Sequence, residues 1–149
     1  MKIAVIGAGC SGLITLKYLL DAFPAEDVIC FEKGYSVRGV WGDQRADFVS
    51  TSTKYTTQFS CFRKWGSDVA PERDYTEFYR GSEFGDYLEA FAAHFHLKER
   101  IRFGVELRHL ERTDQLWALD LVENGKQARV KFDAVFICTG LANQKVPLV

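Results

Sequence analysis

Apolar positions at the start of the chain follow first a strand-like and then a helical pattern. Residues 2–6 form a short β-branched run, which is typical of a parallel strand covered on both faces. Residues 11–23 carry leucines at helical spacing, and Pro24 ends that pattern. Residues 28–31 form a second buried-type strand. This order predicts a strand, a glycine turn, a helix and a strand, which together make a βαβ unit.

The stretch from Glu32 to about Arg80 has no long periodic run of apolar positions. It is rich in Ser, Thr, Tyr, Phe and Gly. Irregular segments of this length in compact domains are usually functional. We therefore expect this segment to pack against a bound ligand.

Helical periodicity returns after Ser82, which we expect to be the N-cap of a helix. Residues 84–95 place aromatic and apolar side chains on one helix face, which is most simply a core-facing stripe. His94 and His96 lie two positions apart at the end of that helix. They therefore point to different faces and do not favour a shared metal.

Strand-like patterns fill the rest of the chain. Residues 101–105 alternate like a strand, and so do residues 116–122 and 128–132. Asn124-Gly125 between the last two is a strong hairpin signal. A small antiparallel meander is therefore expected before residues 134–138, an apolar strand that returns to the parallel sheet.

Composition narrows the class of protein. The 149 residues, 47% hydrophobic and 26% charged with a formal net charge of -1, favour one globular domain. Lys and Arg form no basic stripe, which disfavours nucleic acid as a partner. Glycines interrupt the apolar N-terminus, unlike a signal peptide, and no apolar run reaches the roughly 18 residues of a membrane-spanning segment. Cysteines at positions 10, 30, 61 and 138 form no CxxC pair, so we expect reduced thiols in a soluble, cytoplasmic protein without a metal site.

Gly7, Gly9 and Gly12 match GxGxxG between the first predicted strand and helix. Such a turn brings backbone N–H groups and the positive helix end to a pyrophosphate. Gly7 is expected to permit the tight turn, Gly9 the approach of the phosphate and Gly12 the packing of helix on strand. Glu32, at the end of the second strand, can accept hydrogen bonds from a ribose diol and would repel a 2′-phosphate. The unit therefore favours FAD or NAD over NADP.

The order of motifs resembles the N-terminal FAD half of the flavin-containing monooxygenases. That family reads GxGxSG, then FE, then GGxW, then a Ser/Thr-rich stretch ending in FSxF, and a late strand ending in TG. The matching positions are residues 7–12 with Ser11, Phe31-Glu32-Lys33, Arg38-Gly39-Val40-Trp41, residues 53–62 ending in Phe59-Ser60-Cys61-Phe62, and residues 133–140. The later helix, strand and meander also keep the family's order, so the resemblance covers essentially the whole chain.

The resemblance implies an α/β fold, a Rossmann-like FAD-binding domain of the glutathione-reductase type with a small antiparallel β-meander insertion, incomplete at the C-terminus. The pyrophosphate would lie on residues 9–12 and the adenosine ribose on Glu32. Val40 and Trp41 would lie along the flavin half, and the Val105 backbone beside the adenine. The implied cofactor-binding residues are Gly7, Gly9, Cys10, Ser11, Gly12, Glu32, Lys33, Gly39, Val40, Trp41, Thr53, Lys54, Val105, Thr139 and Gly140.

Two positions depart from the family pattern. Arg38 replaces the first glycine of GGxW, which introduces a long cation that either reaches a phosphate or faces solvent. Alignment on Ser60-Cys61-Phe62 places Lys54 where the family has the active-site Asn that lies near the flavin and nicotinamide.

Family members are roughly three times this length, as a second dinucleotide domain requires. Neither a second GxGxxG nor the family's FxGxxxHxxxY/F signature is present in this sequence. We expect one FAD-binding domain, residues 1–149, made of a βαβ unit (1–33), a flavin-side segment (34–81) and a helix, meander and returning strand (82–149). It would be the FAD-binding portion of an NADPH-dependent monooxygenase of N or S nucleophiles, inactive without a C-terminal half or second chain.

The alternative is a non-catalytic module that binds FAD or NAD. A disulfide reductase is disfavoured because no cysteine pair stands near the flavin segment. Hydrolytic chemistry has no support, since the sequence contains no nucleophile elbow.

Overall fold

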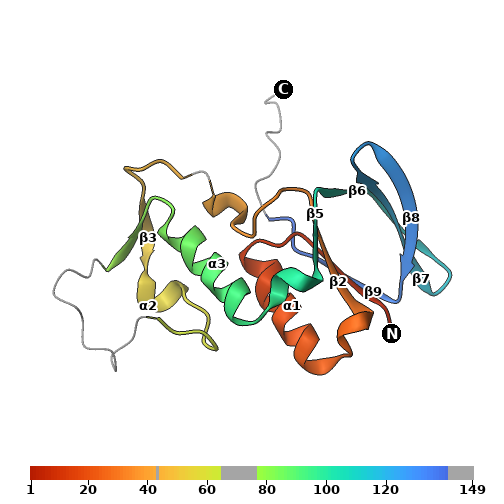
Figure 1. The fold of residues 1–149 in the computed structure, drawn as a ribbon, viewed down its shortest axis with the longest axis horizontal. Coiled ribbons are helices and arrows are strands. Elements are labelled where there is room, and N and C mark those ends of the chain that lie inside the picture. Colours follow the sequence, from red (N-terminus) through yellow and green to blue (C-terminus); the bar gives the residue numbers. More distant parts are fainter. Residues whose placement is uncertain (43, 65–76, 141–149) are drawn as a thin grey trace.

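A parallel sheet forms the centre of the molecule. The computed structural model describes residues 1–42, 44–64 and 77–140; the expected segments 34–81 and 82–149 extend outside these residues. The sheet has the strand order β5-β2-β1-β9, and every neighbouring pair is parallel (Figure 1). Its strands are β1 (Ile3–Ile6), β2 (Val28–Glu32), β5 (Ile101–Phe103) and β9 (Ala134–Ile137).

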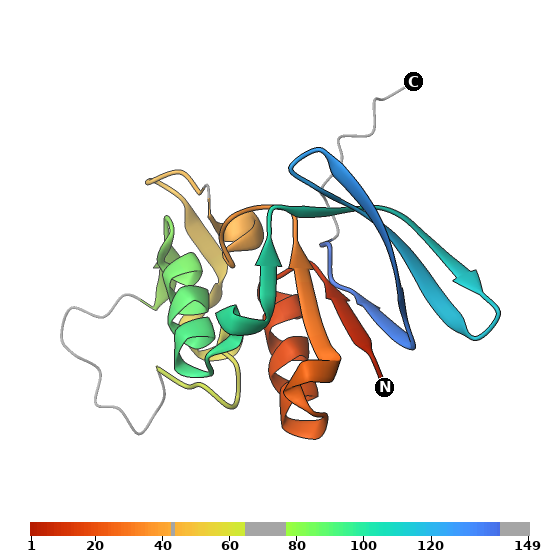
Figure 2. The same ribbon diagram turned by 45° about the vertical axis from the view of Figure 1, so that its right-hand side comes forward.

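The predicted βαβ unit is confirmed. Helix α1 (Cys10–Ala22) connects β1 to β2, and a short 3-10 turn, η1 (Ala25–Asp27), precedes β2. The crossover places α1 beside α3 (Glu83–His94) on one side of the sheet, as Figures 1 and 2 both show. A further 3-10 turn, η3 (Leu97–Arg100), follows α3 and leads into β5.

Each face of the sheet has its own cover because side chains alternate along a strand. One set of alternate positions, which includes Ile3, Val5 and Cys30, packs against α1 and α3. The other set, which includes Ala4 and Phe31, packs against the three-stranded meander. Both faces of β1 are therefore buried, which explains why this strand reads as an unbroken apolar run.

The meander is β6 (Val105–Thr113), β7 (Leu116–Glu123) and β8 (Lys126–Phe132), paired antiparallel in that order. The predicted hairpin is confirmed, with Asn124 and Gly125 at φ 50° and 76°, as a two-residue primed turn requires. Most of β6 was not expected from the sequence. A register shift between Leu107 and His109 interrupts its alternation, and such a bulge hides the period of a strand.

The single strand expected over residues 101–105 is wrong. The chain leaves the parallel sheet at Gly104, whose φ of +71° suits glycine, and Val105 begins the meander.

Two short elements pair in the irregular middle segment: β3 (Val49–Thr53) and β4 (Phe78–Arg80) form an antiparallel ribbon. Helix α2 (Lys54–Thr57) follows β3, and the 3-10 turn η2 (Gly39–Trp41) precedes it.

Ser82 stands at the N-cap of α3 but does not cap it. Its backbone has φ −86° and ψ 4°, and its side chain makes no capping hydrogen bond. An N-cap hydroxyl reaches the first helical amides from an extended backbone, which Ser82 does not adopt. The neighbouring Glu83 carboxylate instead accepts a hydrogen bond from the Arg80 N–H, at 2.7 Å.

Candidate functional site

The glycine turn between β1 and α1 is shaped by two glycines that the fold itself requires. Gly7 has φ +94°, and a Cβ there would lie 2.5 Å from the Cys138 carbonyl oxygen. A Cβ at Gly12 would lie only 1.8 Å from the Gly7 carbonyl oxygen. Side chains at these positions would therefore collide with backbone that cannot move independently.

Gly9 is different because the fold has room for a side chain there. Its φ of −72° is ordinary for any residue. A Cβ would meet only the Cα of Gly39, at 3.6 Å, which is normal van der Waals contact. The missing side chain at Gly9 thus keeps one side of the turn open.

The N-terminus of α1 is left without a capping group of its own. Gly9 is its N-cap, no side chain caps it, and its first turn has no acidic residue. The first amides of a helix, here those of Cys10, Ser11 and Gly12, have no acceptor earlier in the helix. Burial raises the pKa of the Cys10 thiol, which therefore stays neutral. Together with the helix dipole, these groups make the turn suited to an anion.

Glu32 is held at the same turn by both of its carboxylate oxygens. Oε2 accepts a hydrogen bond from the Ala8 N–H at 2.7 Å, and Oε1 accepts one from the Gly34 N–H at 2.7 Å. Each oxygen retains acceptor capacity, since a carboxylate oxygen has two lone pairs. The carboxylate is therefore fixed in orientation beside the glycine turn and can still accept from a ligand hydroxyl.

The end of β5 lies beside Glu32. Glu32 pairs with Phe103 in the parallel register, and the next residue, Gly104, donates a hydrogen bond from its N–H to the Gly34 carbonyl at 3.1 Å. The Val105 side chain is buried between the meander and the parallel sheet, so only its backbone is available to a ligand at this edge. Lys33 is exposed.

The flavin-side segment reaches the turn through Gly39. Gly39 has φ +54° and a Cβ there would lie 3.2 Å from the Gly9 Cα. Val40 beside it is 71% exposed. Trp41 packs edge-on against Phe84 of α3, with ring centroids 5.0 Å apart.

Gly85 is a site residue that the sequence interpretation missed. A Cβ there would lie 2.9 Å from the Trp41 carbonyl oxygen, so glycine lets α3 approach η2 closely. The signal was present, because an isolated glycine inside a helical pattern often marks close packing.

Arg38 neither reaches the glycine turn nor faces solvent alone, which corrects the expectation from the sequence. Its Nη2 lies 2.6 Å from Asp86 Oδ1, and its Nε lies 3.7 Å from Glu89 Oε1. Both carboxylates come from α3. Arg38 therefore ties the flavin-side segment to that helix.

Thr53 and Lys54 lie at the junction of β3 with α2. The Thr53 hydroxyl accepts a hydrogen bond from the Thr56 N–H and so caps α2. Lys54 is only 4% exposed, and its Nζ lies 3.1 Å from Glu83 Oε2. The Lys54 ammonium is thus engaged by α3.

Thr139 and Gly140 lie just beyond β9, after Cys138. The Cys138 N–H donates to the Ile6 carbonyl at 2.8 Å, which extends the pairing of β9 with β1 up to the turn. Gly140 has φ +86°. The structure therefore brings residues 7–12, Glu32, Gly39 and the end of β9 to one edge of the sheet, at the carboxyl ends of its strands.

Tyr87 holds the Phe59-Ser60-Cys61-Phe62 turn from α3, a role that the sequence did not reveal. Its hydroxyl accepts a hydrogen bond from the Phe59 N–H at 2.7 Å and donates one to the Phe62 carbonyl at 2.8 Å. Burial raises the pKa of Tyr87 to about 12. The rings of Phe59 and Phe62 also pack on the Tyr87 ring, with centroid distances of 5.8 Å and 5.6 Å.

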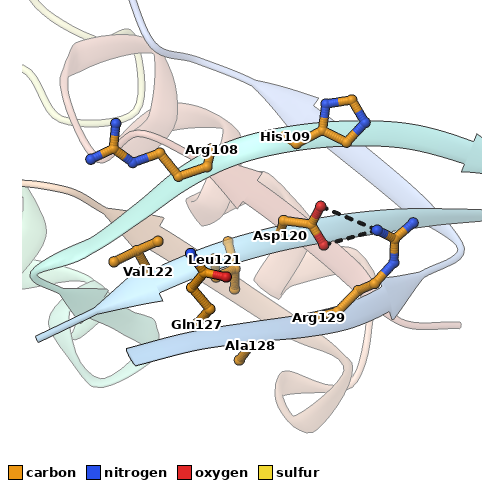
Figure 3. A pocket seen from close by; sticks show the side chains of 8 residues that line it. All are labelled: Arg108, His109, Asp120, Leu121, Val122, Gln127, Ala128 and Arg129. Carbon is orange, nitrogen blue, oxygen red and sulfur yellow. Dashed lines mark hydrogen bonds and ion pairs between the residues drawn. The ribbon is translucent and has the colours of Figure 1, made fainter. Parts of the chain in front are cut away.

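A separate hollow of about 300 Å³ lies on the outer face of the meander (Figure 3). Arg108, His109, Asp120 and Arg129 are among its lining residues, and Arg129 Nη1 donates to both Asp120 oxygens at 3.1 Å. Arg108 is paired as well, with its Nη2 2.9 Å from Glu106 Oε2.

Residues 1–42, 44–64 and 77–140 contain no cluster of three metal-ligating side chains, and none of their helices has the length and apolar character to span a bilayer. All four cysteines are unpaired. The pKa of the buried Cys30 thiol is raised by desolvation.

Fold and site together define a class. A parallel sheet, a glycine turn at an uncapped helix N-terminus and an oriented acid at the next strand form a Rossmann-like dinucleotide-binding fold. The comparisons with known proteins then give the family. The chain belongs to the flavin-binding monooxygenase-like family, whose model matches residues 1–149.

Curated proteins that match the chain in sequence are monooxygenases as well. Dimethylaniline monooxygenase (N-oxide-forming) 4 of Oryctolagus cuniculus is 34% identical over 162 residues, covering 99% of this chain and 28% of the relative. Flavin-containing monooxygenase 2 of Homo sapiens is 33% identical over 151 residues, covering 93% and 27%. The chain thus spans little more than a quarter of the length of these relatives.

Solved structures share the fold. The S-allyl-L-cysteine S-oxygenase from Allium sativum matches with a TM-score of 0.76 at 21% identity, covering 93% of this chain and 36% of that one. OTEMO in complex with FAD and NADP matches with a TM-score of 0.76 at 20% identity, covering 99% and 27%. The predicted Rossmann-like FAD-binding fold is therefore confirmed.

Proposed function

We propose that this chain binds FAD and is the FAD-binding portion of an NADPH-dependent monooxygenase that oxygenates N or S nucleophiles. The observation that carries the proposal is Gly9, where the fold accepts a side chain and none is present. Space kept open at an uncapped helix N-terminus serves a group outside the protein, and a pyrophosphate matches both the space and the charge.

Other residues near Gly9 would contact the successive parts of the ADP half of the cofactor, from the pyrophosphate through the ribose to the adenine. Amides of residues 9–12 would hold the pyrophosphate, and Glu32, already oriented by two backbone N–H groups, would accept from the ribose diol. Lys33 and the Val105 backbone would border the adenine. The choice of FAD over NAD rests on membership of the family and on OTEMO, whose structure holds FAD and NADP.

On the flavin side, Gly39, Val40 and Trp41 would border the isoalloxazine. Thr53 and Lys54 would approach it from the junction of β3 with α2, and Thr139 and Gly140 from the segment after β9. FAD, when bound, supplies the redox chemistry of the reaction. The protein would orient the cofactor through the glycine turn, through Glu32 and through the close approach of Gly39 to Gly9. Trp41, packed against Phe84, would form the protein surface beside the flavin.

The substrate class is supported by the relatives, which include an N-oxide-forming enzyme, and by a fold neighbour that is an S-oxygenase. We propose that hydride transfer from NADPH needs sequence beyond these 149 residues, supplied by a C-terminal half or second chain. The unpaired cysteines favour a reducing compartment, so we propose a cytoplasmic location.

The test is the visible absorption spectrum of the purified 149-residue chain. The wild type and a His94→Ala control on the exposed side of α3 should retain an oxidised-flavin band through desalting, and Glu32→Ala should lose it. Equal retention by all three would remove the proposed site, and no band in any would contradict FAD binding.

NADPH is then added under nitrogen. We expect no bleaching of the flavin band by the chain alone, and bleaching would show that a nicotinamide site exists within it. Adding the C-terminal half of a relative tests the catalytic assignment. A chain that holds FAD yet gives no turnover with that half would be a non-catalytic module.

A further inference from the structure

One aromatic side chain beside Glu32 is far more exposed than its chemistry favours. Tyr35 is 83% exposed, more than any other large hydrophobic side chain among the described residues. A single exposed aromatic side chain needs no explanation by itself. Its position does, because Tyr35 stands at the edge of the sheet where the ribose-binding acid and the Val105 backbone meet.

Two hydrogen bonds fix the backbone immediately before Tyr35. Gly34, the preceding residue, donates its N–H to Glu32 Oε1 at 2.7 Å and accepts from the Gly104 N–H at 3.1 Å. The loop after β2 is thereby joined to the point where the chain leaves β5. Tyr35 is attached to the same network that orients Glu32.

The Tyr35 ring rests on Gly104. A Cβ built at Gly104 would lie 3.1 Å from Tyr35 Cε1, 3.3 Å from its hydroxyl oxygen and 3.4 Å from Cζ. Glycine at position 104 therefore leaves the space in which the ring lies. One part of the ring is supported by backbone, and the rest is exposed to water.

We infer that Tyr35 is a stacking residue for the adenine base of the bound cofactor, an inference that rests on the proposed function. A ribose held by Glu32 carries its base outward from the turn, along the edge formed by Gly34, Tyr35 and Gly104. Adenine has a flat apolar face, and aromatic side chains stack on such faces. The supported and exposed ring of Tyr35 offers that surface, without a preference for the flavin half.

The experiment compares ligands that contain the base with one that lacks it. Binding of ADP, FAD and inorganic pyrophosphate to the 149-residue chain is measured for the wild type, Tyr35→Ala and Tyr35→Phe. Tyr18→Ala, which removes an exposed tyrosine of α1, is the matched control. Circular dichroism verifies that each variant is folded.

Loss of one aromatic stacking partner weakens base binding by about 5- to 100-fold. Tyr35→Ala should therefore weaken the binding of ADP and of FAD by about that factor and leave the binding of pyrophosphate unchanged. Tyr35→Phe keeps the ring and should bind like the wild type, as should Tyr18→Ala. An equal loss for pyrophosphate would assign Tyr35 to the turn rather than to the base and would overturn the inference.

A second readout is the fluorescence of 1,N6-etheno-ADP, which stacking on an aromatic ring quenches. At saturation, the wild type and Tyr35→Phe should quench this probe more than Tyr35→Ala does. Equal quenching and equal ADP affinity in the three proteins would overturn the inference and leave the proposed function standing. No ADP or FAD binding by the wild type would instead overturn the proposed function, and the inference with it.

Discussion

The same substitution at two glycines of one turn should damage different properties: stability at Gly12 and FAD binding at Gly9. A methyl group at Gly12 would lie 1.8 Å from the Gly7 carbonyl oxygen and 2.8 Å from its carbonyl carbon, both backbone atoms. Overpacking a core costs about 1–3 kcal/mol and sometimes more. For Gly12→Ala we expect about 3 kcal/mol or more, because neither the turn nor α1 can move without the other.

Gly9→Ala should leave the fold nearly unchanged. The added methyl meets only Gly39 Cα at 3.6 Å, and the backbone angle of −72° suits alanine. The one expected loss in the free energy of unfolding comes from the helix N-cap, where alanine is less favourable than glycine, and it is less than about 1 kcal/mol. The same methyl stands where the pyrophosphate would approach the amides. Losing one charge-assisted hydrogen bond costs about 1.5–3 kcal/mol, so FAD binding should weaken at least ten-fold.

The assay combines urea unfolding with FAD titration for wild type, Gly9→Ala and Gly12→Ala. The expected pattern is a normal unfolding midpoint with weak binding for Gly9→Ala, and a much lower midpoint for Gly12→Ala. If Gly9→Ala unfolded as readily as Gly12→Ala, the fold itself would need Gly9. If it folded and bound FAD like the wild type, the pyrophosphate would lie elsewhere.

Three further predictions concern groups around the site. Tyr87→Phe removes a hydroxyl that makes two backbone hydrogen bonds and should destabilise the chain by about 1–3 kcal/mol, with faster amide exchange at Phe59. Lys54→Met replaces a buried cation with an apolar side chain of similar volume, so the free energy of unfolding should change by less than about 1 kcal/mol. Glu83→Ala should lower the free energy of unfolding by more, because it removes a carboxylate partner of the buried Lys54 ammonium. Cys30 should react with a thiol reagent at pH 8 only after denaturation, since it is buried and its pKa is raised.

Each of these predictions has a contradicting outcome. Unchanged exchange at Phe59 would mean that Tyr87 does not hold that turn in solution. A larger loss for Lys54→Met than for Glu83→Ala would mean that the ammonium, rather than its burial, stabilises the junction. Labelling of Cys30 in the native state, read by mass spectrometry, would place it in a region that opens readily.

Features that depend on near neighbours in the chain could be predicted from the amino-acid sequence alone. The spacing of Gly7, Gly9 and Gly12 after an apolar run, and the acid at position 32, are local patterns with a fixed mechanical meaning. The Asn124-Gly125 turn is equally local, because only residues that tolerate positive φ form it. The order of motifs from residues 7–12 to residues 133–140 also indicated the family, and the family comparison confirmed it.

Features that depend on partners far away in the chain emerged only from the folded structure. Arg38 could be read as a phosphate ligand until α3 placed Asp86 beside it, 48 residues later. The break at Gly104 was hidden because alternation looks the same whether a strand continues in one sheet or passes into another. No local pattern reveals that Tyr35 rests on Gly104 or that Tyr87 holds the turn at Phe59, since both contacts form only when the chain folds.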